Sequence, residues 1–392
     1  MIQAVSASCY GNNSRQVGKD VATEIKAALG TEPDVVLLFC AAEYDAREVL
    51  AGLHERLAPK VRVVGCSSCA EINSEEATSG SVTAMGLVLG DLVATVVHAS
   101  DENHDSAAIG RQLGAALAPA GAALVILFVD GIVLNSTPLL AGIQSVLGAS
   151  APIVGGVAAD GLTFTRTEEY VDREVLSGAA VALALAGPLE IQTIVAGGWR
   201  ALGNDRVITR ASDSKTIAEL DGVPALSVYQ HYLGELGRDL DNAGLEFPIG
   251  VVAASDGDAA PGEGYIRAVQ GATADGRGVR VSGDIVEGSR VRIMHASRDA
   301  LIDCAAAEVR SAAEQFTRPE LALFFNCAGR KVVLGSRYQD ELRTAFACLP
   351  AGLPKIGFFT YGELAPHAGK TIHHDETFTA VLLRTQDDGR AV

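Results

Sequence analysis

Three stretches of the chain repeat one order of strands and helix, and this repeat is the feature that most constrains the fold. Each stretch has an apolar strand, a helix, a second strand that ends in glycine, a polar loop and a third apolar strand. Strands that alternate with helices are typical of α/β proteins. We therefore predict an α/β fold of repeated strand–helix–strand lobes with mixed sheets, in two domains. The first strands of the three copies are Asp34–Cys40, Ala123–Asp130 and Leu321–Cys327.

The predicted domain boundary lies in the glycine-rich stretch 196–205. We place it between residues 198 and 199, which gives an N-terminal domain over 1–198 and a C-terminal domain over 199–392. Within the second domain we expect a helix over 225–236 and an acidic, glycine-rich surface loop over 255–264.

The first and third copies share a carboxylate after the strand-end glycine. Glu71 lies six residues past Gly65, and Glu363 lies six residues past Gly357. Convergence of ordinary strand–turn patterns is one explanation. Duplication is the other, and it implies similar lobes with a cleft between them, where ligands often bind.

The charge balance limits the classes of partner. The chain has 31 Lys and Arg against 48 Asp and Glu, a formal net charge of −17. Binding to nucleic acid or to an anionic membrane needs clustered cations, so we expect neither. The longest apolar runs, 122–129 and 179–186, are far shorter than the roughly 18 residues that span a bilayer. No signal peptide is apparent, and seven scattered cysteines favour a reducing cytoplasm.

The cysteines allow several interpretations. Cys66 and Cys69 form a C-x-x-C pair after a strand. Redox and metal chemistry are alternatives, but no second pair completes a zinc site, so we favour a structural or ligand-lining turn. Cys66 or Cys327 at strand ends could act as a nucleophile in a cysteine-dependent enzyme, although no histidine is placed by sequence to activate either.

Histidine and arginine supply the remaining candidates. His231 lies off the apolar stripe of its predicted helix, so it is either solvated or a cleft ligand such as an axial base for haem iron. His373 and His374 precede the last strand, in a polar cluster that is either a solvated loop or presents one imidazole to a pocket. Arg330 follows a buried strand and could clamp a ligand carboxylate or a haem propionate, or pair with Glu363.

Six segments together give the sequence a resemblance to the FIST family of bacterial sensory proteins, which have paired FIST N and FIST C domains. The resemblance implies a module that senses small molecules such as amino acids. It also implies a partner in trans, a histidine kinase or a cyclic-di-GMP enzyme. A stand-alone subset, the NosP type, binds haem and senses nitric oxide. The segments are Gly65–Ile72, Gly155–Asp160, Gly198–Arg200, Glu219–Ala225, Phe325–Arg330 and Gly357–Pro366.

Our leading hypothesis is a non-catalytic cytoplasmic sensor whose preferred ligand is haem, with His231 as the axial base. Nitric oxide would then weaken the iron–imidazole bond and release the helix that carries His231. The alternative is a sensor of an amino acid or other small carboxylate, and the second alternative is the cysteine-dependent enzyme. Homodimer formation is left open. The ligand-binding candidates are Arg330, Glu363, Tyr361, Gly362, Glu71, Cys66 and His374. In the amino-acid version Arg330 clamps the carboxylate, and Glu363 or Glu71 binds the ammonium.

Overall fold

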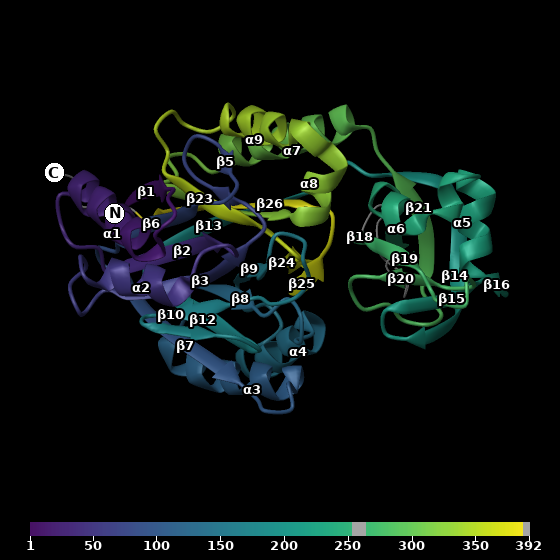
Figure 1. Cartoon of the computed structure of the whole chain (residues 1–392), viewed down its shortest axis with the longest axis horizontal. Coiled ribbons are helices and arrows are strands. Elements are labelled where there is room, and N and C mark those ends of the chain that lie inside the picture. Colours follow the sequence, from purple (N-terminus) through teal and green to yellow (C-terminus); the bar gives the residue numbers. More distant parts are fainter. Residues whose placement is uncertain (253–263, 387–392) are drawn as a thin grey trace.

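Three lobes of the same construction form the body of the molecule (Figure 1). They are seen in a computed structural model that describes residues 1–252 and 264–386. In each lobe the second and third strands run parallel, and the last strand lies antiparallel between the first and the second. The sheets are therefore mixed, and the predicted α/β class with repeated lobes is confirmed. The predicted acidic loop lies outside the described residues except for Gly264.

The strands of the three lobes follow one spatial order. Lobe one has β1 (Gln3–Cys9), β6 (Val82–Val88), β2 (Val35–Ala41) and β3 (Arg62–Ser68). Lobe two has β7 (Val93–Ser100), β12 (Ala179–Ala186), β8 (Leu124–Val129) and β9 (Ile153–Val157). Lobe three has β13 (Leu189–Ala196), β26 (Phe378–Thr385), β22 (Leu321–Cys327) and β23 (Lys355–Thr360).

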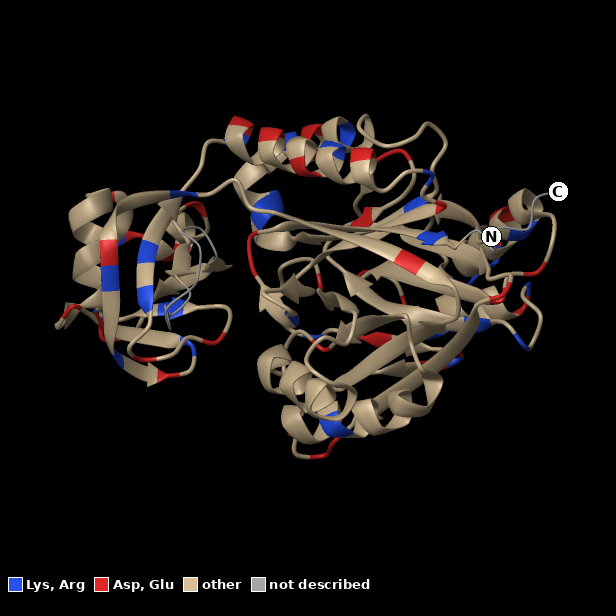
Figure 2. Ribbon diagram, turned by 180° about the vertical axis from the view of Figure 1, so that it is seen from behind, with Lys and Arg blue, Asp and Glu red and all other residues tan. Residues whose placement is uncertain are grey.

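Helices cover the outer face of each sheet. A side-chain cap starts several of them: Asn13 accepts a hydrogen bond from the N–H of Gln16, and Asp45 from those of Arg47 and Glu48. In Figure 2 most charged residues of these helices face outward, while the strands beneath are largely uncharged. The pairs are α1 (Ser14–Leu29) with α2 (Ala46–His54), α3 (Ser106–Leu117) with α4 (Ser136–Leu147), and α7 (Arg298–Gln315) with α9 (Tyr338–Phe346); α8 (Ala328–Leu334) precedes α9.

A hairpin from each lobe completes the sheet of another lobe. In cyclic order, the hairpin of lobe one joins lobe three, that of lobe two joins lobe one, and that of lobe three joins lobe two. The lobes are therefore interlocked by backbone hydrogen bonds. The hairpins are β4 (Glu71–Ile72) with β5 (Ala77–Thr78), β10 (Glu169–Val171) with β11 (Glu174–Leu176), and β24 (Glu363–His367) with β25 (Lys370–His374).

Phenylalanine rings from all three lobes meet where the inner faces of the sheets converge. Phe358 stacks on Phe39 at 4.6 Å between ring centroids, and Phe128 approaches Phe39 edge-on at 5.6 Å. Phe325 lies 5.9 Å from Phe358. All four rings are fully buried. This shared core fills the centre of the body with side chains.

A further unit is inserted into lobe three between β13 and α7, and it lies beside the body (Figure 1). β13 pairs with β26, so the chain on both sides of the predicted boundary at 198/199 contributes to one sheet. The boundary stays a prediction. The inserted unit contains β14 (Arg200–Asp213), β15 (Thr216–Leu220), β16 (Val223–Pro224), α5 (Ala225–Leu233), α6 (Leu240–Ala243), β17 (Ile249–Val252), β18 (Gly264–Arg267), β19 (Val269–Ala272), β20 (Val279–Val281) and β21 (Arg290–His295).

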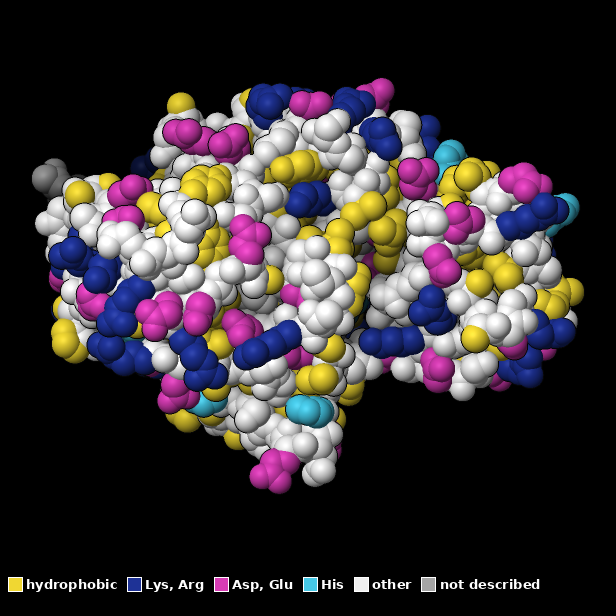
Figure 3. Space-filling model, viewed as in Figure 1, with side chains coloured by type: hydrophobic (Ala, Val, Ile, Leu, Met, Phe, Trp, Pro, Cys, Tyr) yellow, Lys and Arg dark blue, Asp and Glu magenta, His cyan; other side chains and the backbone are white. Residues whose placement is uncertain are grey.

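The surface carries charges of both signs. Acidic and basic side chains are interspersed on the face seen in Figure 3. Among the described residues, no helix has the length and apolar character needed to cross a membrane. The 3-10 turns are η1 (Ala118–Ala120), η2 (Leu236–Arg238), η3 (Gly244–Glu246) and η4 (Gly335–Arg337).

Candidate functional site

Two cavities of the body lie close to the predicted site residues. The smaller, about 170 Å³, lies where lobes two and three meet the inserted unit, and we name it the junction cavity. The larger, about 800 Å³, is an open groove formed mainly by lobes one and two, and we name it the lobe groove. The walls of the junction cavity include Ser136, Lys215, Gln270, Tyr361, His373 and Glu376. Those of the lobe groove include Tyr44, Ser68, Cys69, Asp160, Glu168 and Lys331.

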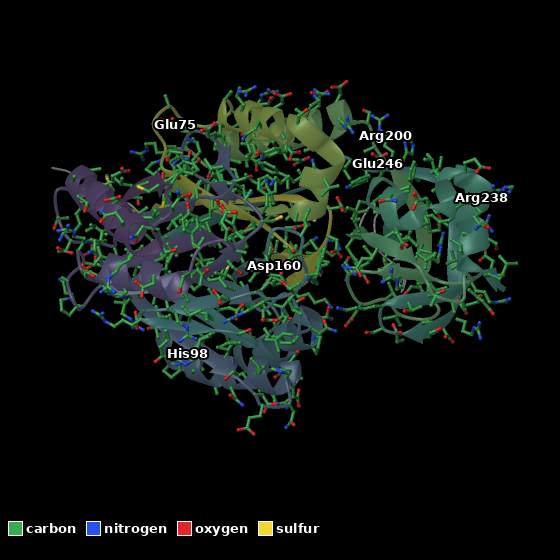
Figure 4. All side chains as sticks on the ribbon, in the orientation of Figure 1. Glu75, His98, Asp160, Arg200, Arg238 and Glu246 are labelled. Carbon is green, nitrogen blue, oxygen red and sulfur yellow. The ribbon has the colours of Figure 1, made fainter. Side chains whose placement is uncertain are left out.

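The loop that starts at Asp160 contributes residues to the walls of both cavities. The Asp160 carboxylate accepts hydrogen bonds from the N–H groups of Phe164, Thr165 and Arg166 and from the hydroxyl of Tyr361. Although burial raises the pKa of Asp160, these hydrogen bonds bring it well below its usual range. The Tyr361 ring also stacks on Phe164 at 4.5 Å. Asp160, labelled in Figure 4, thus holds Tyr361 in the cavity wall.

Glu376 is the most unusual group in the junction cavity. Its side chain is fully buried, and neither carboxyl oxygen has a hydrogen-bond partner among the described residues. Burial, with a further contribution from the charge of Asp375, raises its pKa to about 8. A Cβ atom at position 329 would lie 2.1 Å from Glu376 Oε1, so Gly329 makes the room for this carboxyl group. An unpaired buried carboxyl costs stability unless a partner arrives from outside.

A chain of hydrogen bonds runs through the same wall. Ser136 Oγ lies 2.7 Å from His373 Nδ1, and His373 Nε2 lies 3.2 Å from Asp375 Oδ1. Arg267 of the inserted unit is 3.4 Å from Asp375 Oδ2 and donates to the carbonyl oxygen of His373 at 3.0 Å. Burial raises the pKa of Asp375, but the charge and hydrogen bond of His373, together with Arg267, bring it below its usual value. Asp375 is therefore ionised at neutral pH.

The predicted glutamates lie in the exchanged hairpins and not in a cavity wall. Glu71 accepts hydrogen bonds from the hydroxyls of Ser68 and Ser81, and burial raises its pKa to about 7. Glu363 accepts from the hydroxyl of Thr377 at 2.6 Å, and burial raises its pKa well above the usual value. Both are fully buried. Neither carboxylate lines the junction cavity or the lobe groove, so their contacts with ligand stay predictions without support from these two cavities.

Arg330 also lines neither of these two cavities. Its guanidinium is fully buried, forms an ion pair with Glu341 at 2.7 Å, and donates to the carbonyl oxygens of Gly197 and Leu301. These partners leave it no role as a clamp for a ligand carboxylate. The ion-pair interpretation describes this residue, with Glu341 in place of the expected Glu363.

The thiols lie in environments that favour the protonated form. Cys66 is buried in the central core, and burial raises its pKa well above the usual value. Burial also raises the pKa of Cys69 to about 11 and that of Cys327 well above its usual range. Cys66 lines neither the junction cavity nor the lobe groove, and its contact with ligand stays a prediction. The cysteine-dependent enzyme stays a prediction, with poor support from thiols that are neutral at pH 7.

The polar cluster before the last strand is buried, which corrects the solvated-loop interpretation. Only one of the two imidazoles lines the junction cavity, as expected for neighbouring residues of a strand. It belongs to His373 and not to the candidate His374. His374 lies 3.3 Å from the carbonyl oxygen of Ala365, and burial lowers its pKa to about 3. Gly362 contacts the His373 ring so closely that a Cβ there would lie 2.0 Å from Cε1. Gly362 therefore positions the imidazole.

Neither the junction cavity nor the lobe groove offers haem a site with His231 as the axial base. A third cavity of about 370 Å³ has His54 and His98 in its wall. His231 is exposed on α5, on the side of the inserted unit that faces away from the body (Figure 1), and it lines neither cavity. The walls of the lobe groove contain no histidine, and the junction cavity is smaller than the about 300–1,000 Å³ of ordinary cofactor pockets. No group of three or more metal-ligating side chains occurs in the described parts of the chain. Haem and nitric oxide sensing stay predictions of the resemblance.

Sequence reasoning missed the residues that make the junction cavity distinctive. Ser136 and His373 are separated by more than two hundred positions, so no spacing links them. The signal that was present is the run of four polar residues, 373–376, directly before an apolar strand. A third hairpin glutamate, Glu169, was also missed: it corresponds to Glu71 and Glu363 in register, but an insertion separates it from its strand-end glycine.

Comparison with known proteins identifies two tandem family domains. The FIST N domain matches residues 34–223, and the FIST C domain matches residues 225–366. An uncharacterized protein of Mycobacterium tuberculosis is 32% identical over 244 residues, and one of Mycobacterium bovis is 31% identical over 245 residues. The matches cover 59% and 60% of this chain. The chain spans about three fifths of the length of these relatives, 60% and 61%.

Among solved structures, a cyanuric acid hydrolase from A. caulinodans covers 99% of this chain and all of its own, with a TM-score of 0.40 and 9% identity. A second cyanuric acid hydrolase covers 98% of this chain and all of its own, with a TM-score of 0.35 and 10% identity. At these scores the likeness carries no argument about activity.

Proposed function

Because this chain belongs to the FIST family, whose members are sensory domains, we propose that it senses a small amino-bearing ligand, such as an amino acid, in the junction cavity. One observation carries the proposal: in the wall of a cavity, the fully buried Glu376 carboxyl has no hydrogen-bond partner among the residues that the structure describes. A ligand ammonium would give it the charge and the donors that it lacks.

The wall from the inserted unit suits the other end of an amino acid. Lys215 and Gln270 reach the cavity from the inserted unit, and Lys215 is exposed. A carboxylate between them would place the ligand across the contact of the inserted unit with the body. Such a ligand could favour one arrangement of the two only by its differential affinity for them. A histidine kinase or cyclic-di-GMP enzyme in trans would read that change, as the family resemblance implies.

The pKa of Glu376 predicts how binding depends on pH. The free carboxyl, with a pKa of about 8, is largely protonated at pH 7. Binding of an ammonium favours the ionised form and therefore releases a proton. The affinity should rise by up to about tenfold per pH unit between pH 6 and 8. The rise ends where the ligand ammonium loses its own proton.

Thermal shift and calorimetric titration against amino acids, amines and des-amino acids test the proposal. Amino-bearing compounds should stabilise the protein in proportion to the logarithm of concentration over Kd. Glu376→Gln should abolish the shift. Glu75→Gln, an exposed control labelled in Figure 4, should not. Absence of any shift with amino compounds, or a full shift in Glu376→Gln, would overturn the assignment.

A further inference from the structure

Ser136, His373 and Asp375 form one continuous hydrogen-bonded chain in the wall of the junction cavity. We propose that this chain makes Ser136 Oγ a nucleophile, and that the cavity cleaves small α-amino acyl esters or amides. The inference rests on the proposed function for the recognition of the amino group, and it departs from the expectation of a protein without catalytic activity.

The geometry assigns a role to each member of the chain. The Asp375 carboxylate accepts, so the imidazole proton that faces it belongs on Nε2. The Nδ1 lone pair then faces the Ser136 hydroxyl at 2.7 Å, within reach for general-base catalysis. All three side chains are buried, with exposed fractions of 6%, 7% and 1%, so water does not compete for these bonds. Nucleophile, base and orienting acid are the parts that activate a serine in hydrolases.

The surrounding backbone supports the same role. Ser136 is the first residue of α4, a helix of 12 residues capped by Asn135. The positive end of the helix dipole therefore lies beside the hydroxyl, where it would stabilise the negative oxygen that forms during attack on a carbonyl. Gly362 leaves room for the imidazole, and Arg267 fixes its carbonyl oxygen.

Comparison of the three lobes argues against a purely structural tie. His373 pairs with Leu364, and the residues in the same register position of the other hairpins are Ala77 and Val175. The interlocking of the lobes thus does not require a histidine. The inserted unit is also tied by a separate bond from Asn135 Nδ2 to Asp284 at 3.0 Å. The hydrogen-bonded residues Ser136, His373 and Asp375 lie in the wall of the same cavity as the Glu376 carboxyl.

The reaction is balanced without a further reagent. Ser136 Oγ bonds to the carbonyl carbon while its proton passes to His373 Nδ1, and the carbonyl π pair moves to oxygen. The tetrahedral species then expels the alcohol or amine, which takes the proton from the imidazolium, and leaves an acyl-serine. A water molecule then attacks the acyl-serine. Its proton passes through His373 Nδ1 to Ser136 Oγ, and the amino acid is released. Glu376 binds the substrate ammonium throughout.

Hydrolysis of alanine methyl ester and of its des-amino analogue, methyl propanoate, tests the inference on the full-length protein. The wild type should cleave the alanine ester, and mass spectrometry should find an alanyl group on Ser136. Ser136→Ala and His373→Gln should each lower the rate at least about hundredfold. Ser145→Ala, on the same helix but bonded to the Gly142 carbonyl oxygen, should leave it unchanged. Glu376→Gln should lower only the preference for the amino ester.

The outcomes separate the two proposals. If amino acids stabilise the protein but the wild type neither cleaves the ester nor acquires an acyl group on Ser136, the catalytic inference is wrong and the sensor stands. If both esters are cleaved equally and no amino acid binds, the serine chemistry stands and the amino-ligand assignment fails. Labelling of wild-type Ser136 by a small sulfonyl fluoride needs no variant. Failure of that labelling in folded protein would also count against a nucleophilic serine.

Discussion

Glu71 on β4 is the register partner of Phe358 on β23, so a hairpin of the first lobe completes the sheet of the third. The same exchange joins the other two pairs of lobes, and the Phe358 ring lies in the shared core. The lobes are therefore unable to separate without breaking both sheet hydrogen bonds and aromatic contacts.

Phe358→Ala should destabilise all three lobes together. Removal of a fully buried ring from this core is expected to cost about 3–5 kcal/mol. Urea unfolding followed by far-UV circular dichroism measures the loss, and the body should still unfold in one transition. Val93→Ala, at a position that is 64% exposed, is the control and should change stability little. Separate transitions for the lobes would contradict the interlocked description.

The buried Glu71 predicts a decline of stability as pH rises. Its folded pKa of about 7 is above that of an unfolded glutamate, so the native state binds more protons between about pH 4.5 and 7. The unfolding free energy should therefore fall across this window, by up to about 3 kcal/mol from this one group. Glu71→Gln should flatten the slope. Denaturant titrations at pH 5, 6, 7 and 8 measure the unfolding free energy of both proteins. An equal pH dependence in Glu71→Gln and the wild type would count against the raised pKa of Glu71.

The strand core of the body could be predicted because buried parallel strands appear in the sequence as continuous apolar runs. The predicted closing strand 178–186 is β12 (Ala179–Ala186), and the predicted 81–89 is β6 (Val82–Val88). The matching glycine-to-glutamate spacing found two of the three equivalent glutamates, Glu71 and Glu363. The third escaped because its insertion, the Asp160 loop, breaks the spacing.

The site could not be predicted in the same way because its contacts join distant segments. The position of Arg330 after a buried strand predicts a ligand partner, but Glu341 pairs with it from α9, and its carbonyl partners come from Gly197 and Leu301. The pairing of Ser136 with His373 depends on the exchanged hairpin, which no local pattern reveals.

Gly18→Ala should separate α1 from α2. A Cβ at this position would lie 2.1 Å from the carbonyl oxygen of Val49, a backbone atom that cannot move alone. We expect the steric conflict to outweigh the gain in helix propensity and to cost about 1–3 kcal/mol. Gly197→Ala, where the new Cβ would meet nothing closer than 3.7 Å, is the matched control. Equal melting temperatures for the two variants would contradict the predicted contact.

Arg330→Met should lower stability without removing ligand binding. The substitution leaves Glu341 fully buried with no countercharge, which is expected to cost about 3–5 kcal/mol. The double variant Arg330→Met with Glu341→Leu removes both charges and should recover most of that loss. Chemical denaturation measures both variants, and thermal shift with amino acids should persist in the double variant because the guanidinium does not line the junction cavity. Loss of ligand binding in a stable double variant would return Arg330 to the ligand site.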